Sequence, residues 1–300
     1  MRLFRSSVVF FAFILPFIVW GQTPQMIKLA EGAKVPDIND IDFRYLACTD
    51  QFAGTISLVP QAGQSNDMSS RRIFLCKNDS IKLIGNRDFN LTGDPQIASL
   101  PGIAYAFYRC APTVNGPNLA SILTDPCIQG NPSPPPTSPG IWIYADPNSR
   151  FGDATFRNLG LVQSTFNSNL PYELFFAPIT VDEAAINGYE STGGGPAGPC
   201  VNVNTAQKFS VVYLNELTIT NLQKTGALTG NFVIGGGLSQ FDNSTSYNIT
   251  IERVGNPLIT GSIIGGPYKH NQTVNFSVPS DGTYTITVED GKSCGVSSVI

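Results

Sequence analysis

The chain has 300 residues, enough for two or three domains of ordinary size. Only 13% of the residues are charged, and the 29 glycines and 22 prolines suit an all-β chain rich in turns, which argues against long solvated helices. The formal net charge is -4. No basic patch interleaved with aromatic residues occurs, so nucleic acid is not an expected partner.

Residues 1–21 have the pattern of a secretory signal peptide. Arg2 and Arg5 form the positive region, Val8–Val19 is apolar, and Val19-Trp20-Gly21 offers the cleavage site. The apolar run is short for a membrane span, which disfavours the alternative of an uncleaved anchor. The mature chain has no second run of this kind, so we expect no transmembrane span after signal cleavage.

Residues 22–200 are expected to form an N-terminal β-rich domain with long loops. The continuous apolar run Ile103–Tyr108 indicates a strand buried on both faces. Leu119–Leu123, which follows Gly116-Pro117-Asn118, indicates one or two helical turns. Other strands of this domain are expected at Thr55–Val59, Ile73–Cys76, Ile81–Ile84, Ile141–Tyr144 and Glu173–Ala177.

The domain boundary is expected near residue 200, because Ser191–Pro199 is the richest run of strand-breaking residues in the chain. Residues 201–300 would then form a second domain. Runs of period two recur there at intervals of roughly ten to fifteen residues, which is typical of an immunoglobulin- or PKD-like β-sandwich. The runs are Phe209–Leu214, Asn231–Ile234, Tyr247–Ile251, Ile259–Ile264, Thr273–Val278 and Thr283–Val288.

The last two of these runs are expected to pair as a hairpin across Pro279-Ser280-Asp281-Gly282. Tyr284 follows the Asp-Gly turn directly and so resembles the tyrosine corner of immunoglobulin-like sandwiches. Gly295–Ile300 could open another domain, and we expect further domains beyond Ile300.

The six cysteines, an even number in a chain with a signal peptide, indicate disulfides. No Cys-x-x-Cys motif occurs, which argues against a zinc ribbon or a thioredoxin-type site. Many pairings are open on sequence alone. Cys110 with Cys127, which bracket a short segment, is the preferred pair; Cys48 with Cys76 is second, which leaves Cys200 with Cys294.

The loop Asn86–Asp94 carries oxygen-bearing side chains at alternate positions and is the one candidate for calcium, a cation that needs several such ligands. The ligands would include Asp88, Asn90 and Asp94. However, the glycine is misplaced for an EF-hand and no closing glutamate follows. Because Asn and Asp are ordinary turn formers, a plain turn is the favoured interpretation, and no cofactor is expected.

No motif points to a reaction. His270 is the only histidine, and no Gly-x-Ser-x-Gly motif accompanies it. Two carboxylates at the right separation could hydrolyse a glycoside, but solvated loop acids are the simpler interpretation. We therefore expect a non-enzymatic protein. The acids considered are Asp146, Asp153, Glu173, Asp182 and Glu183.

Aromatic side chains gather in two of the expected strands and allow two interpretations, a sugar-stacking platform or the hydrophobic core. Alternate aromatic residues in strands mostly face inward and supply much of the burial in a sandwich, so the core is favoured. The residues are Tyr105, Phe107, Tyr108, Trp142 and Tyr144.

Several stretches resemble the N-terminal region of exported Bacteroidota proteins that carry a gliding-motility-associated C-terminal domain. The first are Phe74-Leu75-Cys76-Lys77-Asn78-Asp79-Ser80-Ile81, Gly102–Cys110 and Ile122–Cys127. Downstream, Gly236–Phe241, and Gly282–Asp290 with Cys294, are similar to PKD-like and gliding-adhesin repeats. The likeness covers most of residues 48 to 294. It implies type IX secretion, a place outside the outer membrane, and a role in adhesion, in gliding motility or as a spacer.

The sequence thus predicts an all-β protein of tandem immunoglobulin- or PKD-like sandwich domains behind a cleaved signal peptide. We expect a secreted or cell-surface structural or adhesion protein that presents loops to a surface polysaccharide or a protein ligand. The alternative is a carbohydrate-binding module or an accessory domain of a secreted polysaccharide-degrading enzyme.

Overall fold

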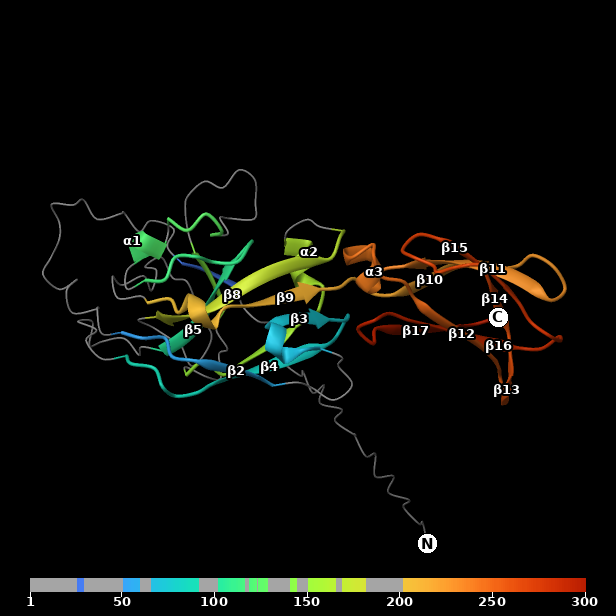
Figure 1. Ribbon diagram of the computed structural model, residues 1–300, viewed down its shortest axis with the longest axis horizontal. Coiled ribbons are helices and arrows are strands. Elements are labelled where there is room, and N and C mark those ends of the chain that lie inside the picture. The colour runs from blue at the N-terminus through green and yellow to red at the C-terminus, as the bar shows by residue number, and fades with distance from the viewer. Residues whose placement is uncertain are drawn as a thin grey trace, which may run out of the picture.

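The computed structural model shows an all-β chain of two immunoglobulin-like β-sandwich units joined end to end (Figure 1). The structure describes residues 26–29, 51–59, 66–91, 102–116, 119–122, 124–128, 141–144, 151–165, 169–181 and 202–300. The expected signal peptide lies outside them. Within these ranges, no helix has the length and apolar character needed to cross a membrane.

The first unit is made of two facing sheets. Its larger sheet has the order β1-β6-β5-β8-β9-β3, with strands Met26–Leu29, Ile141–Tyr144, Gly102–Tyr108, Tyr172–Val181, Phe209–Tyr213 and Arg72–Leu75. Its smaller sheet has the order β2-β4-β7, with strands Ile56–Val59, Ser80–Gly85 and Ala154–Arg157. The pairing of β3 with β9 is parallel, and the other pairings between these described strands are antiparallel.

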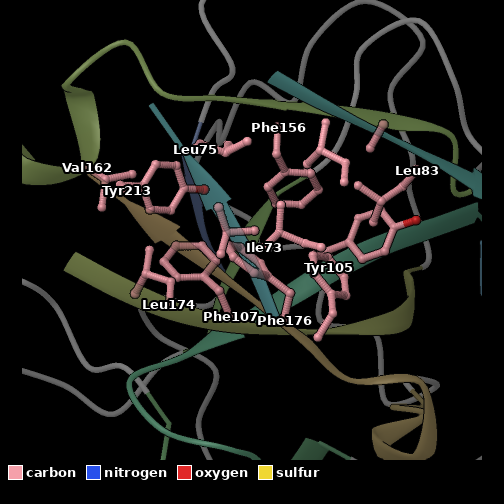
Figure 2. Packing of buried hydrophobic residues seen from close by; sticks show 14 of the residues in the cluster. Ile73, Leu75, Leu83, Tyr105, Phe107, Phe156, Val162, Leu174, Phe176 and Tyr213 are labelled. Atoms are coloured by element: carbon pink, nitrogen blue, oxygen red, sulfur yellow. The ribbon is translucent and has the colours of Figure 1, made fainter. Parts of the chain in front are cut away.

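The core of this unit lies between the two sheets, and strands β4 and β7 of the smaller sheet turn every second side chain into it. In β4, Ile81 and Leu83 are fully buried while Lys82 between them is exposed. Phe156 of β7 meets Phe176 at a ring-centroid distance of 4.6 Å and Tyr105 at 5.6 Å (Figure 2). Such edge-to-face contacts contribute about 0.5–1.5 kcal/mol each beyond their buried area.

Strand β5 is buried along its whole length, as its continuous apolar run predicts. One face packs into the inter-sheet core, and the other is covered by the short helix α1 (Leu119–Ile122) and by the segment that ends near Cys127. The helical turns expected here are confirmed. The preferred disulfide is confirmed too, since Cys110 and Cys127 are bonded with Cα atoms 5.0 Å apart. Its loop of 17 residues corresponds to about 3 kcal/mol of chain entropy.

The second unit is a sandwich of two four-stranded sheets. One has the order β10-β11-β15-β14, with strands Thr218–Lys224, Thr229–Gly235, Thr273–Ser277 and Ser262–Ile264. The other has the order β13-β12-β16-β17, with strands Asn256–Thr260, Asn248–Arg253, Tyr284–Glu289 and Gly295–Val299. Its core gathers fully buried residues from both sheets, among them Phe232, Ile234, Val274, Ile286 and Val288.

The expected hairpin of β15 and β16 is wrong, because the two strands lie in different sheets. β15 pairs with β11 and β14, while β16 pairs with β12 and β17. The link between them crosses the sandwich. At this crossing the Tyr284 hydroxyl donates a hydrogen bond to the main-chain oxygen of Ser280 at 3.0 Å, which is the geometry of a tyrosine corner. Alternation of apolar residues reports which face is buried and not which strand is the neighbour, which explains the error.

Three further boundaries differ from expectation. The single strand expected at Ile259–Ile264 is divided at Gly261 into β13 and β14, which belong to opposite sheets. Gly295–Val299 does not open a further domain but forms β17, paired with β16.

The first unit does not end near residue 200, since β9 pairs with β8 and β3 and the chain leaves this unit after Leu214. Glycine and proline mark loops inside a domain as readily as linkers between domains, and Ser191–Pro199 itself lies outside the described residues.

Candidate functional site at the junction of the two units

A disulfide connects the first unit to the second. Cys76 follows β3, and Cys294 lies in the turn between β16 and β17; their sulfurs are bonded and their Cα atoms are 5.4 Å apart. This bond contradicts two expected pairs, Cys48 with Cys76 and Cys200 with Cys294. The order of the cysteines along the chain does not indicate that the turns at Cys76 and Cys294 meet in space. Cys48 and Cys200 lie outside the described residues.

Each half of the disulfide is held by local turn chemistry. On the second unit, the Asp290 carboxylate accepts hydrogen bonds from the main-chain N–H groups of Lys292 at 2.8 Å and of Cys294 at 3.1 Å. On the first unit, the Asp79 main-chain N–H donates to the Cys76 oxygen at 3.0 Å and closes the turn after β3. Burial raises the pKa of the Asp79 carboxyl, which lies in this turn. Both cysteines are therefore presented by tight, hydrogen-bonded turns.

A small hydrophobic cluster surrounds this bond, which we call the junction cluster: Val212, Leu214, Leu238 and Cys294, with Phe74, Cys76 and Phe241 packed against them. It takes residues from β3 and β9 of the first unit and from α3 (Gly237–Phe241) and the β16–β17 turn of the second. Figure 1 shows α3 between the two sandwiches. The two units therefore share buried apolar surface in addition to the covalent bond.

Cations cover the aromatic rings of the junction cluster. Phe74 and Phe241 meet edge to face at 6.0 Å, and the Arg72 guanidinium lies 5.3 Å from the centroid of each ring. The Lys292 ammonium lies 4.4 Å from the Phe74 centroid. Arg72 also makes two hydrogen bonds to the Glu173 carboxylate, at 2.7 and 2.9 Å. Cation–π contacts at exposed sites contribute about 0.5–1 kcal/mol each, so these contacts reinforce the junction modestly.

A polar network fixes α3 against the second sandwich and the linker. The Asp290 carboxylate accepts the main-chain N–H of Leu238 at 2.6 Å. Gly236, at the start of α3, has φ +82°, and an added Cβ there would lie 1.8 Å from the main-chain oxygen of Glu216. Only glycine fits this approach of two backbones. Asn215 in the linker donates from its amide to the main-chain oxygen of Asn169 at 2.7 Å, which joins the linker to the first unit.

Asn158 is the central polar group on the first unit's side. It is fully buried, and its amide nitrogen donates to the main-chain oxygens of Leu75 at 2.8 Å and Leu214 at 2.7 Å. These bonds tie the end of β3 to the chain segment that leaves for the second unit. A buried amide that satisfies two main-chain carbonyls fixes their relative position, because breaking the bonds would leave polar groups unpaired.

An open hollow of about 440 Å³ lies beside the junction. The first unit contributes a turn residue, the helix α2 (Leu161–Thr165) and the start of the segment after it, and the linker contributes the rest. Its lining is mostly polar and carries one ammonium and one carboxylate. The lining residues are Lys77, Gly160, Gln163, Ser164, Asn169, Leu214, Asn215 and Glu216.

Of the three candidate calcium ligands, the structure describes Asp88 and Asn90. The Asp88 carboxylate accepts the Thr55 main-chain N–H at 2.7 Å and the Thr55 hydroxyl at 2.8 Å, and these bonds lower the Asp88 pKa although its slight burial opposes them. Asn90 pairs through its backbone with Phe52. Asp94 lies outside the described residues. Within the part of the chain that is described, no three His, Cys, Asp or Glu side chains gather as a metal site would require.

The residues weighed for catalysis have other contacts. His270 accepts a hydrogen bond at Nδ1 from the main-chain N–H of Gly236 at 3.1 Å, and burial lowers its pKa. Asp153 is ion-paired with Arg87 at 2.6 Å, and Glu173 is ion-paired with Arg72. The other three acids considered, Asp146, Asp182 and Glu183, lie outside the described residues.

The aromatic residues follow the core interpretation where their side chains are described. Tyr105, Phe107 and Tyr108 are at most 2% exposed. For Trp142 and Tyr144 the structure describes the strand β6 and not the side chains.

Four polar residues at the junction were not predicted from the sequence: Asn158, Gln163, Arg72 and Asp290. Buried polar residues inside β-rich chains have no period of their own, so they cannot be separated from loop residues by pattern. One signal was present for Asp290, because Asp290-Gly291 is a turn dipeptide four residues before a cysteine.

Comparisons with known proteins assign no family to this chain. No protein-family model matches the chain, and no curated protein matches it. Among solved structures, domains 3 and 4 of rat CD4 share 7% identity at a TM-score of 0.24, over 76% of this chain and 97% of that one. The Yersinia pseudotuberculosis adhesin InvE shares 7% identity at a TM-score of 0.23, over 84% of this chain and 60% of that one. Both TM-scores are too low for either likeness to carry an argument.

Proposed function

We propose that this chain is a non-enzymatic secreted or cell-surface protein that acts as a rigid spacer and adhesion scaffold. The observation that carries the proposal is the Cys76–Cys294 disulfide, set in a shared hydrophobic cluster between the two sandwiches. A scaffold that presents loops to a partner gains from a fixed angle between its units, since less ordering is then needed on binding.

The two described disulfides also support a place outside the cytoplasm, because such bonds persist in oxidising surroundings. Export by the type IX route and a part in gliding motility belong to this proposal through the sequence resemblance. The engagement of His270, Asp153 and Glu173 in structural contacts supports a non-enzymatic role for these three residues.

The test uses the exported chain, residues 22–300, attached to beads and flowed over surfaces coated with polysaccharides or outer-membrane fractions. We expect retention of the beads by the oxidised protein. We also expect reduced retention for the variant Cys76→Ala/Cys294→Ala, in which each sandwich stays folded but the angle between them is free. Turnover of a coated polysaccharide, if a single carboxylate substitution abolishes it, would overturn the proposal. Retention of beads without protein, equal to that of beads that carry the oxidised protein, would overturn it as well.

A further inference from the structure

His270 holds the start of α3 at two points. Its imidazole Nδ1 accepts the main-chain N–H of Gly236 at 3.1 Å, and its own main-chain N–H donates to the Ser239 hydroxyl at 3.2 Å. Gly236 directly precedes α3, and Ser239 lies within it. His270 itself lies in the link between β14 and β15, so this link and the start of α3 are fixed to each other.

α3 in turn supplies part of the contact between the two units. Leu238 and Phe241 belong to the junction cluster, and Phe241 meets Phe74 of β3 edge to face. The main-chain N–H of Gly237 donates to the main-chain oxygen of Asn215 in the linker at 3.1 Å. A displacement of α3 therefore changes both apolar and polar contacts of the junction.

The hydrogen bond at Nδ1 depends on the charge of the ring. An imidazole nitrogen that accepts a hydrogen bond carries no proton, so the neutral ring of His270 has its proton on Nε2. In the charged ring both nitrogens carry protons, and Nδ1 would then point an N–H at the N–H of Gly236. Gly236 is buried, so its N–H would be left without a replacement acceptor from water.

Five other titratable groups surround α3 and its flanking turns: Glu216, Asp242, Tyr247, Lys269 and Asp290. Hydrogen bonds from Ser244 lower the pKa of the Asp242 carboxyl, and burial raises the pKa of Tyr247 to about 12. Histidine is the side chain whose ordinary pKa places its charge change between about pH 5 and about pH 8. Burial lowers the pKa of His270, so its charge change lies on the acid side of the ordinary value.

We infer that acid loosens the junction between the two units through His270. Protonation of Nδ1 removes the acceptor of the Gly236 N–H, releases the start of α3, and so weakens the contacts of Leu238 and Phe241 with the first unit. The two units are coupled firmly at neutral pH and less firmly in acid, while the Cys76–Cys294 bond keeps them connected. This pH response goes beyond the proposed function and does not depend on any adhesive role.

The experiment measures how fast a water-soluble trialkylphosphine reduces each disulfide of the oxidised chain, residues 22–300, at about pH 7.5 and at about pH 4.5. Cys294 is buried in the junction cluster and Cys76 is half-buried, so opening of the junction should expose their bond to the reagent. The Cys110–Cys127 bond, whose Cys110 is exposed, is the internal reference for the pH dependence of the reagent. Released thiols are blocked with a maleimide and counted by peptide mass spectrometry.

Two variants separate the hydrogen bond from the titration. In His270→Asn, the amide oxygen takes the place of Nδ1 and can accept at either pH. In His270→Leu, no acceptor remains at either pH. Circular dichroism at both pH values confirms that each variant is folded.

We expect the ratio of the two rates, Cys76–Cys294 over Cys110–Cys127, to rise about threefold or more in acid for the wild type, the order of effect of one lost hydrogen bond. The ratio should not depend on pH in either variant, and in His270→Leu it should be raised at both pH values. A wild-type ratio that does not change with pH overturns the inference. So does a rise of equal size in either variant, or a ratio in His270→Leu that stays at the neutral wild-type value. Retention of beads at neutral pH tests the scaffold proposal separately, so the two can fail independently.

Discussion

Removing the Cys76–Cys294 disulfide should destabilise the whole chain more than removing Cys110–Cys127. The first bond closes a loop of 218 residues that includes most of both sandwiches, whereas the second closes 17. Loop-closure entropy grows with the logarithm of length, which gives about 5 kcal/mol for the long loop and about 3 kcal/mol for the short one. Cysteines are changed in pairs, Cys76→Ala/Cys294→Ala and Cys110→Ala/Cys127→Ala, so that no unpaired thiol remains.

Urea unfolding followed by tryptophan and far-UV signals measures the two losses. We expect the wild type to unfold in one coupled transition and the Cys76→Ala/Cys294→Ala variant to show two, because the sandwiches then open independently. The Cys110→Ala/Cys127→Ala variant should keep a single transition, with a lower free energy of unfolding than the wild type. The reasoning is refuted if Cys76→Ala/Cys294→Ala lowers the free energy of unfolding by less than about 1 kcal/mol and still unfolds in one transition. The junction cluster alone would then couple the units.

Three smaller changes test the second sandwich. Tyr284→Phe removes the tyrosine-corner hydrogen bond and should cost about 0.5–1.5 kcal/mol in urea unfolding; a neutral result would mean that the bond contributes nothing. The stability of this unit should fall as the pH drops below about 6.5, because the lowered pKa of His270 keeps it neutral when folded while the unfolded chain takes up the proton. The variant His270→Gln should make the stability depend less on pH in this range. An unchanged pH dependence would mean that other groups cause it. Asp290→Asn replaces one acceptor oxygen by a donor facing main-chain N–H groups and should cost about 1–3 kcal/mol, with equal stability contradicting the network around Leu238.

Local pattern predicted the strands well and their partners poorly. The apolar run of β5 and the alternation of β16 are set by burial within a few residues, and both strands form where expected. β7, β10 and β17 were missed. β10 exposes or only half-buries its residues, so its period is weak. β17 alternates between exposed and half-buried residues, so its segment was interpreted as the possible start of another domain. Pairing depends on contacts between residues far apart in sequence, which is why β15 and β16 were assigned to one hairpin.

The same distinction explains why the candidate site was not foreseen. The Cys110–Cys127 bond joins residues 17 apart, and proximity in sequence was enough to select it. The junction joins a turn at Cys76 to a turn at Cys294, and only the folded positions of both sandwiches bring them together.

The polar groups that set the geometry there, Asn158 and Asp290, each satisfy main-chain groups on two different segments. An apolar contact tolerates sliding, but a buried amide or carboxylate with several hydrogen bonds has one acceptable position, because any other leaves polar atoms unpaired. Asn158 and Asp290 therefore each fix one half of the junction, and the Cys76–Cys294 disulfide and the junction cluster join the two halves.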